Sequence, residues 1–235
     1  SYCTSKKTLS ELNIIKNYSF ASLDIRRHES LRNRVIEFNP ELIVNFAAES
    51  HVDNSILNSD NFISSNIIGT YNLLCIANES LTNLKLFHQI STDEVFGDLN
   101  KGDCPFTESS HINPSSPYSA SKASADLLVR AWGRTYGVPY LITNCSNNFG
   151  PRQYTEKLIP KICKDFFSGD VFGLYGNGKN IRDWIHVKDH VTAIIKLYEA
   201  NIKNESINIG GEKELTNIEI LEMLKKIFLK KYNIV

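Results

Sequence analysis

Short apolar segments alternate with longer amphipathic segments between residues 18 and 145 of this chain. The apolar segments have the length of strands, whereas the amphipathic segments are long enough to form helices. The predicted strands are residues 18–23, 42–47, 84–90 and 139–145, and the predicted helices are residues 25–38, 58–79 and 118–136. Strands separated by helices of this length favour a parallel sheet with helices on both faces. The sequence therefore predicts an α/β fold.

The pattern changes after Pro151, where the segments become shorter. The predicted elements there are helices at residues 157–167 and 187–200, and strands at residues 171–175, 183–187 and 206–209. Thr216, with Glu219 at the capping-box spacing, predicts the start of a last helix. We therefore expect one part at residues 1–150 and a smaller α/β part at residues 151–235. Residues 182–200 are expected to pack back on the first part.

A glycine-rich phosphate motif is missing from the chain. Open α/β sheets usually bind a dinucleotide through the turn G-x-G-x-x-G, which follows their first strand. No such motif occurs here, and no strand is predicted before residue 18. Two explanations stay open at this point: the sheet binds no dinucleotide, or the chain is a fragment of a longer protein.

Composition excludes several classes of function. Lysine plus arginine and aspartate plus glutamate both number 26, so the net charge of zero predicts neither a nucleic-acid partner nor a membrane surface. No segment is long and apolar enough to span a bilayer. The 5 cysteines form no C-x-x-C pair, which favours a cytoplasmic protein without disulfides. His186 and His190 have metal-ligand spacing but no evident third ligand, so we expect packing and capping roles and no metal.

Tyr118 and Lys122 stand four residues apart in the predicted helix 118–136. Their side chains therefore project from the same helix face. An ammonium group close to a phenol lowers the phenol's pKa from about 10 and makes it useful as a base. Many helices carry this pair by chance, so an exposed helix start with two ordinary side chains is the alternative.

An acidic pair, Asp93 and Glu94, follows the predicted strand 84–90. The carboxyl ends of parallel strands are where such sheets build their sites. An enzyme that eliminates water needs one carboxylate as a base and one carboxylic acid as a proton donor, so two neighbouring carboxyl groups suit that chemistry. The alternative is helix capping by Ser91, Thr92 and Asp93, with Glu94 in the first turn.

Taken together with other motifs in the same order, these segments resemble the dTDP-glucose 4,6-dehydratases. This family belongs to the extended short-chain dehydrogenases/reductases, and the resemblance covers essentially the whole chain. The segments that carry it are residues 23–25, 46–53, 91–97, 118–122, 144–151, 156–160, 178–184 and 208–211. Asp93 beside Glu94 favours glucose dehydratases, because GDP-mannose 4,6-dehydratases typically carry Ser at the first position and sugar 4-epimerases usually lack the acidic pair.

The resemblance implies a Rossmann-like doubly wound sheet, truncated at its N-terminus because the family's phosphate loop would precede residue 1. It assigns NAD binding to residues 1–150 and sugar-nucleotide binding to residues 151–235. It also implies a homodimer and a link to rhamnose biosynthesis. The implied reaction converts dTDP-glucose into dTDP-4-keto-6-deoxyglucose. A UDP-glucose dehydratase is the first alternative; a sugar 4-epimerase, a non-catalytic NAD-binding relative and an inactive truncated product are the others.

The resemblance also implies roles for five catalytic residues. Tyr118, assisted by Lys122 and by the positive charge of the nicotinamide ring, removes the proton of the sugar 4-hydroxyl while C4 passes a hydride to NAD. Thr92 hydrogen-bonds the same hydroxyl. Glu94 then takes the C5 proton, and Asp93 donates a proton to the departing 6-hydroxyl. The hydride finally returns to C6.

Binding residues follow from the same resemblance. Those expected to bind NAD are Ser1, Asp24, Ile25, Phe46, Ala47, Ala48, Glu49, Ser50, Ser65, Tyr118, Lys122 and Asn148. Those expected to bind the sugar nucleotide are Ser50, Thr92, Asn147, Lys157, Leu158, Gly173, Leu174, Tyr175, Arg182 and Asn217. The guanidinium of Arg182 suits a diphosphate because it presents a rigid fork of donors, and a surface ion pair with Asp183 is the alternative.

Three positions depart from the family pattern. Phe96 and Phe149 stand where the family usually has Tyr, and Asn54 stands where it usually has Arg. None of the three is among the predicted proton-transfer groups. They leave the preference for a particular sugar nucleotide open.

Overall fold

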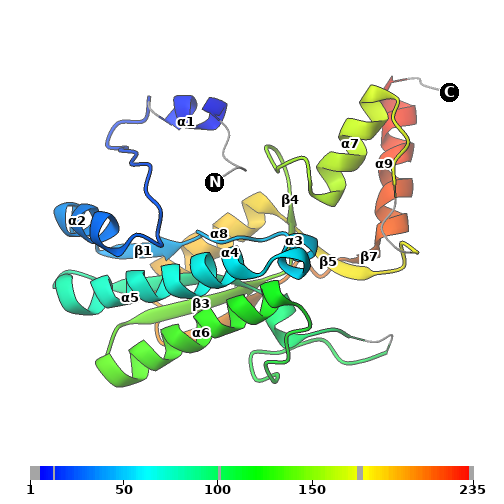
Figure 1. Cartoon of the computed structure of the whole chain (residues 1–235). Helices are drawn as coiled ribbons and strands as arrows, with labels where there is room; N and C mark the ends of the chain where they lie inside the picture. Colours follow the sequence, from blue (N-terminus) through cyan, green and yellow to red (C-terminus); the bar gives the residue numbers. More distant parts are fainter. Residues whose placement is uncertain (1–5, 13, 100–101, 174–176, 233–235) are drawn as a thin grey trace. The chain divides into compact units, whose positions relative to one another are not determined.

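The computed structural model describes residues 6–12, 14–99, 102–173 and 177–232 (Figure 1). Its contacts divide the chain into two compact units. The large unit holds residues 22–145 and 193–209, and the small unit holds residues 1–21, 146–192 and 210–235. The expected functional division at residue 150 stays a prediction, because the units are defined by contacts alone.

A four-stranded sheet forms the centre of the large unit. Its strands lie in the order β1 (Leu42–Asn45), β2 (Leu86–Thr92), β3 (Tyr140–Cys145) and β6 (Glu205–Ile209). Every neighbouring pair is parallel. The carboxyl ends of all four strands therefore meet at one edge of the sheet, and the predicted parallel sheet is confirmed.

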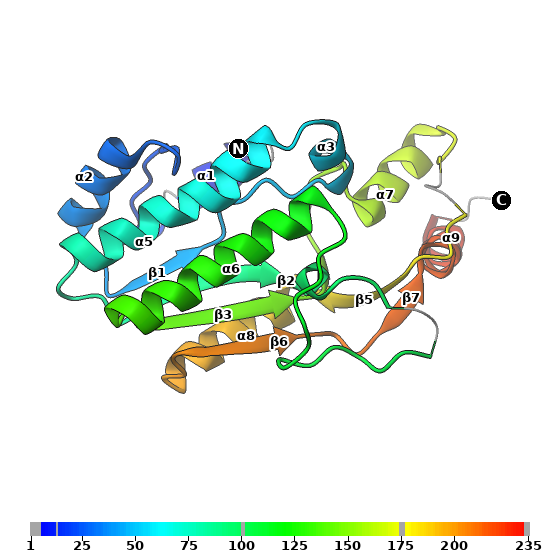
Figure 2. The same cartoon turned by 60° about the horizontal axis from the view of Figure 1, so that its bottom comes forward.

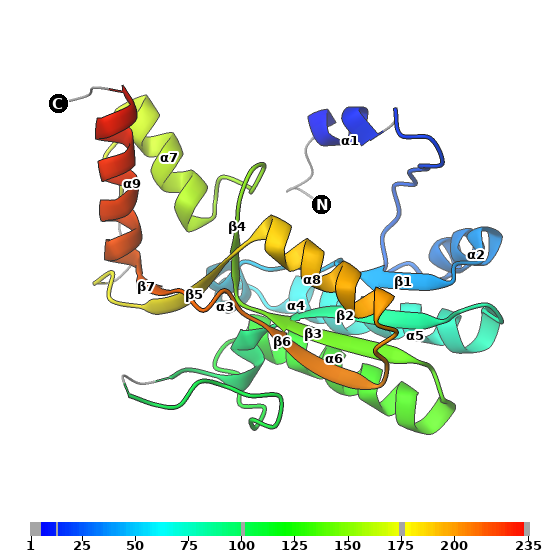
Figure 3. The same cartoon turned by 180° about the vertical axis from the view of Figure 1, so that it is seen from behind.

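Helices cover both faces of this sheet. The helices α5 (Gly69–Ser80) and α6 (Pro117–Tyr136) connect successive strands and lie on one face (Figure 2). Residues 193–199, the last part of α8 (Val187–Glu199), lie on the other face (Figure 3). The remaining helical segments of the large unit are α2 (His28–Phe38), α3 (Val52–Leu57), α4 (Asp60–Phe62), a π-helical segment (Ile63–Ile68) and a 3₁₀ turn (Asp93–Phe96). This is the predicted doubly wound, Rossmann-like arrangement.

The core of the large unit lies between the sheet and the helices α5 and α6. Phe87 and Ile142 from the strands are fully buried against Leu74 and Ile76 of α5 and Val129 of α6. Phe87, Gln89 and Ser91 are alternate residues of β2 and so point to the same face of the sheet. The apolar packing thus fixes which face each polar side chain of β2 presents.

The small unit contains a three-stranded sheet with β5 (Ile181–His186) in the middle. The strand β4 (Asn147–Phe149) pairs with it in parallel, and β7 (Glu214–Thr216) pairs with it antiparallel. Its helices are α1 (Lys6–Leu12), α7 (Leu158–Ser168), α9 (Asn217–Tyr232) and the first part of α8. The predicted capping box is confirmed: Glu219 N–H donates to Thr216 Oγ1 at 3.1 Å, and Thr216 N–H donates to Glu219 Oε2 at 2.7 Å.

Two predicted strands are wrong or incomplete. Residues 18–23 form no strand, and Phe20 and Leu23 are 54% and 41% exposed, because their alternating pattern has no partner strand in the described part of the chain. Residues 171–173 are also not a strand, and the rest of that prediction, Leu174 and Tyr175, lies outside the described residues. The predicted helix 58–79 is divided by the π-helical segment, whose Asn66 is buried.

No helix among the described residues is both long and apolar enough to cross a lipid bilayer. The same residues contain no group of three or more His, Cys, Asp or Glu side chains that could hold a metal ion.

Candidate active site

The acidic pair stands where β2 ends. Thr92, the last residue of β2, is buried, and its hydroxyl caps the following 3₁₀ turn by accepting from Glu94 N–H at 3.3 Å. The same hydroxyl donates to Asp93 Oδ1 at 3.3 Å. Gly97 closes the turn with a φ of 99°, and an added Cβ would lie 2.5 Å from Asn113 O, so this position requires glycine. The capping that was the alternative is thus observed for Thr92, and this cap holds Asp93 and Glu94 at the carboxyl edge of the sheet.

Local sequence fixes the start of α6 just before Tyr118. Ser116 and Ser119 form a reciprocal capping box, and Pro117 occupies the first helical position, where its missing N–H costs nothing. Tyr118 N–H donates to Ser55 Oγ at 3.1 Å, and its ring meets Phe62 edge-on at 6.3 Å. These contacts anchor the first turn of the helix on which the phenol stands.

The hydroxyl of Tyr118 reaches the acidic pair. Burial raises the pKa of Tyr118 above its usual value, and the charge of Glu94 raises it further, while a hydrogen bond with Thr92 lowers it. The predicted lowering of this pKa includes the positive charge of the nicotinamide ring and stays a prediction; among the protein's own groups, burial and the Glu94 carboxylate outweigh the hydrogen bond. The phenol is protonated at neutral pH until an added positive charge opposes these effects.

Lys122 is 4% exposed, so the alternative of an ordinary surface lysine is wrong. Its ammonium group donates to Ile90 O at 2.6 Å, next to the residues that end β2. Burial lowers the pKa of Lys122, and the nearby Asp126 carboxylate opposes that effect. The predicted pair Tyr118–Lys122 thus lies on the sheet-facing side of α6, as its spacing requires.

The loop after β1 is held by two buried asparagines. Asn45 Nδ2 donates to Gln89 Oε1 at 2.9 Å, and its Oδ1 accepts from Ala47 N–H at 3.2 Å. Asn66 accepts from Glu49 N–H at 2.8 Å and donates to Glu49 O at 3.0 Å and to Ser121 Oγ at 2.8 Å. The loop that was predicted to contact NAD, residues 46–50, is therefore tied to α6.

Three further predicted NAD residues lie in the large unit. Asp24 binds Arg26 through both carboxylate oxygens, and the hydrogen bonds from Arg26 lower the pKa of Asp24 to about 2. Ile25 packs against α5, where a side chain at Gly69 would lie 2.4 Å from Ile25 Cδ1. Ser65 is half-buried in the π-helical segment. Ser1 lies outside the described residues.

The small unit holds the other predicted binding residues. Asn148 of β4 is bonded to His190 at 2.8 Å, beside its half-buried neighbour Asn147. Lys157 precedes α7 without a side-chain capping bond, Leu158 is the first residue of α7, and Asn217 is the first residue of α9. Gly173 and Arg182 are exposed, whereas Leu174 and Tyr175 lie outside the described residues.

The Arg182 guanidinium donates to Ile181 O at 3.0 Å. Asp183 does not need it as a partner, because its carboxylate accepts from the backbone N–H groups of Gly211 and Lys213, both at 2.6 Å. The ion pair between Arg182 and Asp183 is thus not what holds either side chain.

The structure adds residues that the sequence had not indicated. Asn66 and Ser121 link the loop after β1 to α6, and Ser91, Asp126 and Asn144 are buried beside Lys122 or the end of β2. Asp126 could have been noticed, since it continues the four-residue spacing of Tyr118 and Lys122. Asn66 carried no such signal, because a lone polar residue in an apolar helix has no distinctive pattern.

Comparisons with known proteins agree on one group. The family model described as GDP-mannose 4,6 dehydratase matches residues 2–233. A dTDP-glucose 4,6-dehydratase of Neisseria meningitidis serogroup B is 43% identical over 230 residues, which are 95% of this chain and 65% of the relative. One from Escherichia coli is 43% identical over 241 residues, covering 96% and 67%. The chain thus spans about two thirds of the length of the curated relatives it matches.

A solved structure matches closely as well. The dTDP-glucose 4,6-dehydratase DesIV from Streptomyces venezuelae, crystallised with NAD bound, superposes with a TM-score of 0.90 at 38% sequence identity. The match covers 96% of this chain and 68% of that one.

Proposed function

Because this chain belongs to the dTDP-glucose 4,6-dehydratases, within the wider GDP-mannose 4,6-dehydratase family, we propose that the protein converts dTDP-glucose into dTDP-4-keto-6-deoxyglucose and water. One observation carries the proposal. The charges of Asp93 and Glu94, which follow β2 directly, act on the phenol of Tyr118. The helix of Tyr118 also carries the buried Lys122. The reaction makes this protein a hydro-lyase.

NAD is the proposed cofactor, and the residues of the large unit fit it. The carboxyl ends of β1 and β2 lie side by side, which is where doubly wound sheets bind dinucleotides. Phe46 follows β1 and is 59% exposed, so it can face a ligand, while Asn66 fixes the rest of the loop. When bound, NAD supplies a reversible hydride acceptor, together with a positive charge beside the phenol. Asp24, Ile25, Ser65 and Asn148 are proposed as further contacts.

The first proton transfer is proposed for Tyr118. A hydrogen bond with Thr92 lowers the pKa of its hydroxyl, and both groups are proposed to bind the sugar hydroxyl at C4. Lys122 stands one helical turn away, so its ammonium favours the phenolate electrostatically. Loss of the 4-hydroxyl proton and of a hydride from C4 leaves a ketone there, and this ketone makes the C5 proton acidic.

Elimination is proposed for the acidic pair. Glu94 takes the proton from C5, and Asp93 gives a proton to the 6-hydroxyl, so a double bond forms between C5 and C6 as water leaves. The hydride then returns to C6 and a proton to C5. The 3₁₀ turn places both carboxylates within one turn of backbone, which suits two groups that act on adjacent carbons.

The sugar nucleotide is proposed to contact Ser50 and Thr92 in the large unit. In the small unit the proposed contacts are Asn147, Lys157, Leu158, Gly173, Leu174, Tyr175, Arg182 and Asn217. Arg182 is exposed and is not engaged with Asp183, so its guanidinium is available to a diphosphate.

Incubation of the full-length protein with dTDP-glucose tests the proposal. The expected product has the mass of the substrate less one water, and its ketone at C4 and methyl group at C6 are visible by NMR. Glu94→Gln should still oxidise C4 but lose no water, whereas Tyr118→Phe should do neither. A full-length protein that binds NAD yet forms no dehydrated product from dTDP-glucose would refute the proposal.

The same assay separates the alternatives. A UDP-glucose dehydratase would form its product faster from UDP-glucose than from dTDP-glucose. A sugar 4-epimerase would give a product of unchanged mass, and a non-catalytic NAD-binding protein would give none. The acidic pair favours elimination over epimerisation, because only elimination requires a second acid and base.

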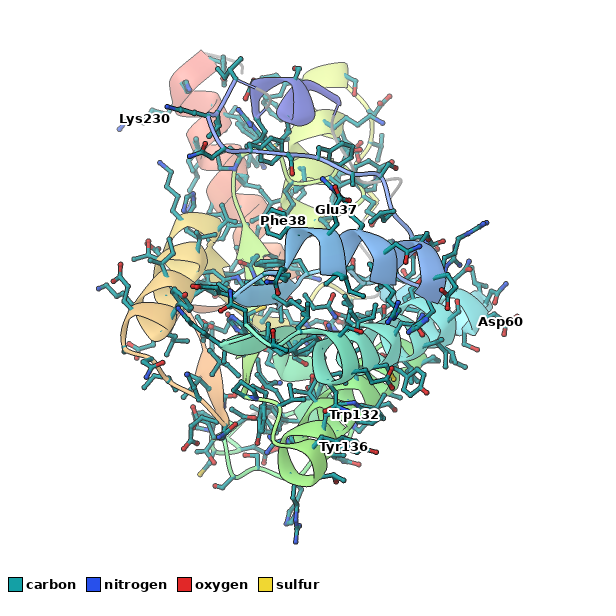
Figure 4. The ribbon with its side chains drawn as sticks, turned by 90° about the vertical axis from the view of Figure 1, so that its left-hand side faces the viewer. Glu37, Phe38, Asp60, Trp132, Tyr136 and Lys230 are labelled. Carbon is teal, nitrogen blue, oxygen red and sulfur yellow. The ribbon has the colours of Figure 1, made fainter. Side chains whose placement is uncertain are left out.

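We also propose a cytoplasmic homodimer that acts in rhamnose biosynthesis. Support for the dimer comes from α5 and α6, which expose Tyr71, Leu127 and Tyr136 at 42%, 53% and 55%. The ring of Trp132 meets that of Tyr71 edge-on, with centroids 5.8 Å apart, and lies tilted to that of Tyr136, with centroids 5.4 Å apart. Trp132 and Tyr136 both stand on α6 (Figure 4). Apolar surface of this kind marks association sites. Light scattering of the wild type and of Leu127→Glu tests the dimer: a monomeric wild type would refute it.

A further inference from the structure

The sheet-facing side of α6 carries a column of ionisable side chains. Tyr118, Lys122, Asp126 and Arg130 follow one another at intervals of four residues, so each lies one turn from the next. Lys122 and Asp126 are 4% and 2% exposed. A buried carboxylate is costly unless other groups compensate its charge, so Asp126 needs a physical reason to be there.

Asp126 is bonded to the strand that ends in the acidic pair. Ser91 Oγ donates to Asp126 Oδ2 at 2.5 Å, and Ser91 directly precedes Thr92. Lys122 Nζ donates to Ile90 O, the residue before Ser91. Lys122 and Asp126 of α6 therefore bind consecutive residues of β2.

We propose that Asp126 is a positioning residue for the reaction: its carboxylate is the buried counter-charge that keeps Lys122 an ammonium. Lys122 in turn favours the phenolate of Tyr118. This role rests on the proposed function, since it concerns the base of that reaction. Nothing in the resemblance or in the predicted site assigned a role to Asp126.

The charged groups around the column support this role. From α6 itself, Lys122 and Arg130 face Asp126, and both lower its pKa against burial, which raises it to about 6. Ser91 of β2 and Asn144 of β3 also lower it. These groups counter the burial of Asp126 and favour its charged form, the form that can act as a counter-charge for Lys122.

The other neighbours do not supply this counter-charge. Cys145 of β3 acts on both Lys122 and Tyr118, but its thiol donates a hydrogen bond to Ser91 O at 3.3 Å and is not a carboxylate like Asp126. The Asp93 and Glu94 charges of the 3₁₀ turn act on Tyr118, where they oppose the phenolate. For Lys122, Asp126 is the largest effect that opposes burial.

The direction in which Asp126→Asn moves the pKa of Tyr118 distinguishes a direct effect of Asp126 on the phenol from an effect through Lys122. Asp126 stands eight residues from Tyr118, about 12 Å along the helix, whereas Lys122 stands about 6 Å away. Removing the carboxylate would slightly lower the phenol's pKa if Lys122 stayed charged. If Lys122 loses its proton instead, the loss of the nearer positive charge raises the phenol's pKa.

The direct test is the titration of Lys122 in the full-length protein with NAD bound. The Cε resonance of ¹³C-labelled lysine, assigned by its loss in Lys122→Met, reports the lysine's pKa without any turnover. Asp126→Asn should lower the pKa of Lys122 by about one unit, the effect typical of losing one nearby opposite charge. An unchanged pKa of Lys122 would overturn the proposal, whether or not the protein is a dehydratase.

The kinetic test uses the pH profile of kcat/KM for dTDP-glucose. In Asp126→Asn the alkaline limb, on which Lys122 must stay protonated, should move to lower pH by about one unit, which is about a tenfold loss at a fixed pH on that limb. The rate below the limb should stay near wild type. An alkaline limb that stays in place or moves to higher pH overturns the proposal. A wild type without dehydration would instead refute the proposed function.

Three variants keep the test specific. Asp165→Asn is the matched control, because Asp165 is also a buried aspartate four residues after a lysine, bonded to Lys161 at 2.7 Å in α7. It should move neither measurement. Asp126→Glu keeps the negative charge, so a full-sized shift in the pKa of Lys122 there would overturn the role of the charge. If Asp126→Asn does not fold, Asp126→Ser removes the carboxylate and keeps a polar group beside Ser91; it should move the pKa of Lys122 in the same direction, and no movement would count against the proposal.

Discussion

Asn66 is expected to be among the most sensitive positions of the large unit. It is 1% exposed, and its side chain makes three hydrogen bonds, two to the backbone of Glu49 and one to Ser121 Oγ. Ser121 Oγ in turn donates to Tyr118 O at 2.7 Å. Asn66→Ala would therefore release the loop after β1 from the first turns of the catalytic helix.

The magnitude follows from a comparison with Asn72, one and a half turns further along the same helical stretch. Asn72 is 5% exposed and donates a single hydrogen bond, to Ile25 O at 2.9 Å. Replacement of either by alanine removes the same atoms from a helix, so cavity and helix-propensity effects largely cancel. The two additional bonds of Asn66, at about 1 kcal/mol each, predict that Asn66→Ala lowers the free energy of unfolding by about 2 kcal/mol more than Asn72→Ala.

Urea denaturation followed by circular dichroism measures this difference, with m-values compared to verify that the transition is the same. NAD affinity, measured by calorimetry on the full-length protein, should fall in Asn66→Ala, because residues 46–50 lose their fixed position. The reasoning would be refuted if Asn66→Ala cost no more stability than Asn72→Ala. That result would mean that the bonds to Glu49 and Ser121 are replaced by water without loss.

Three further predictions address the chemistry and the small unit. Tyr118→Phe should lower kcat at least about 100-fold, since it removes a general base, and near-normal turnover would contradict its role. Gly211→Ala should lower the free energy of unfolding by about 2 kcal/mol or more, because the new Cβ would lie 2.1 Å from Trp184 O. At Gly173 an added Cβ would meet no atom within 4 Å, so Gly173→Ala should change the free energy of unfolding by less than about 0.5 kcal/mol; urea denaturation measures both variants. Burial alone would raise the pKa of Asp183, but hydrogen bonds from backbone N–H groups lower it below 3.8. Its contribution to stability is therefore complete at neutral pH and is lost as the pH falls through and below 3.8, so Asp183→Asn should flatten the acid side of the stability curve; an unchanged slope would count against this.

The sheet of the large unit was predictable because short strand-length segments alternate with helix-length segments along the chain. Every residue of β2 is buried, as is typical of a central strand of a parallel sheet. The segment at residues 18–23 shows the limit of the same reasoning. Its apolar and polar residues alternate as they do in a strand. A strand exists only when a neighbouring strand supplies hydrogen bonds, however, and the local sequence does not contain that neighbour.

The candidate site shows a similar division between local and long-range information. The spacing of Tyr118 and Lys122 predicted that they share a helix face, and the capping sequence Ser116-Pro117 fixes where that helix begins. The direction of the tyrosine's pKa could not be predicted from spacing. It depends on burial and on Glu94, which reaches the phenol from the end of another element. Pairwise motifs are enough to propose the reacting groups, whereas the ionisation of these groups depends on the tertiary structure.

Asp126 shows why the tertiary structure, and not only the local spacing of residues, matters for the proposed reaction. An aspartate four residues after a lysine is ordinary on an exposed helix, where the pair stabilises the fold by less than about 1 kcal/mol. Once the pair is buried, the same spacing has a different consequence: the lysine's charge depends on the aspartate, and the aspartate's position depends on Ser91. Because Ser91 is followed directly by Thr92, Asp93 and Glu94, the strand that leads to the proposed acid and base is also the strand on which the lysine and its proposed counter-charge are fixed. A shift of α6 along β2 would therefore disturb the oxidation and the elimination together, which predicts that substitutions at this contact lower both steps rather than one.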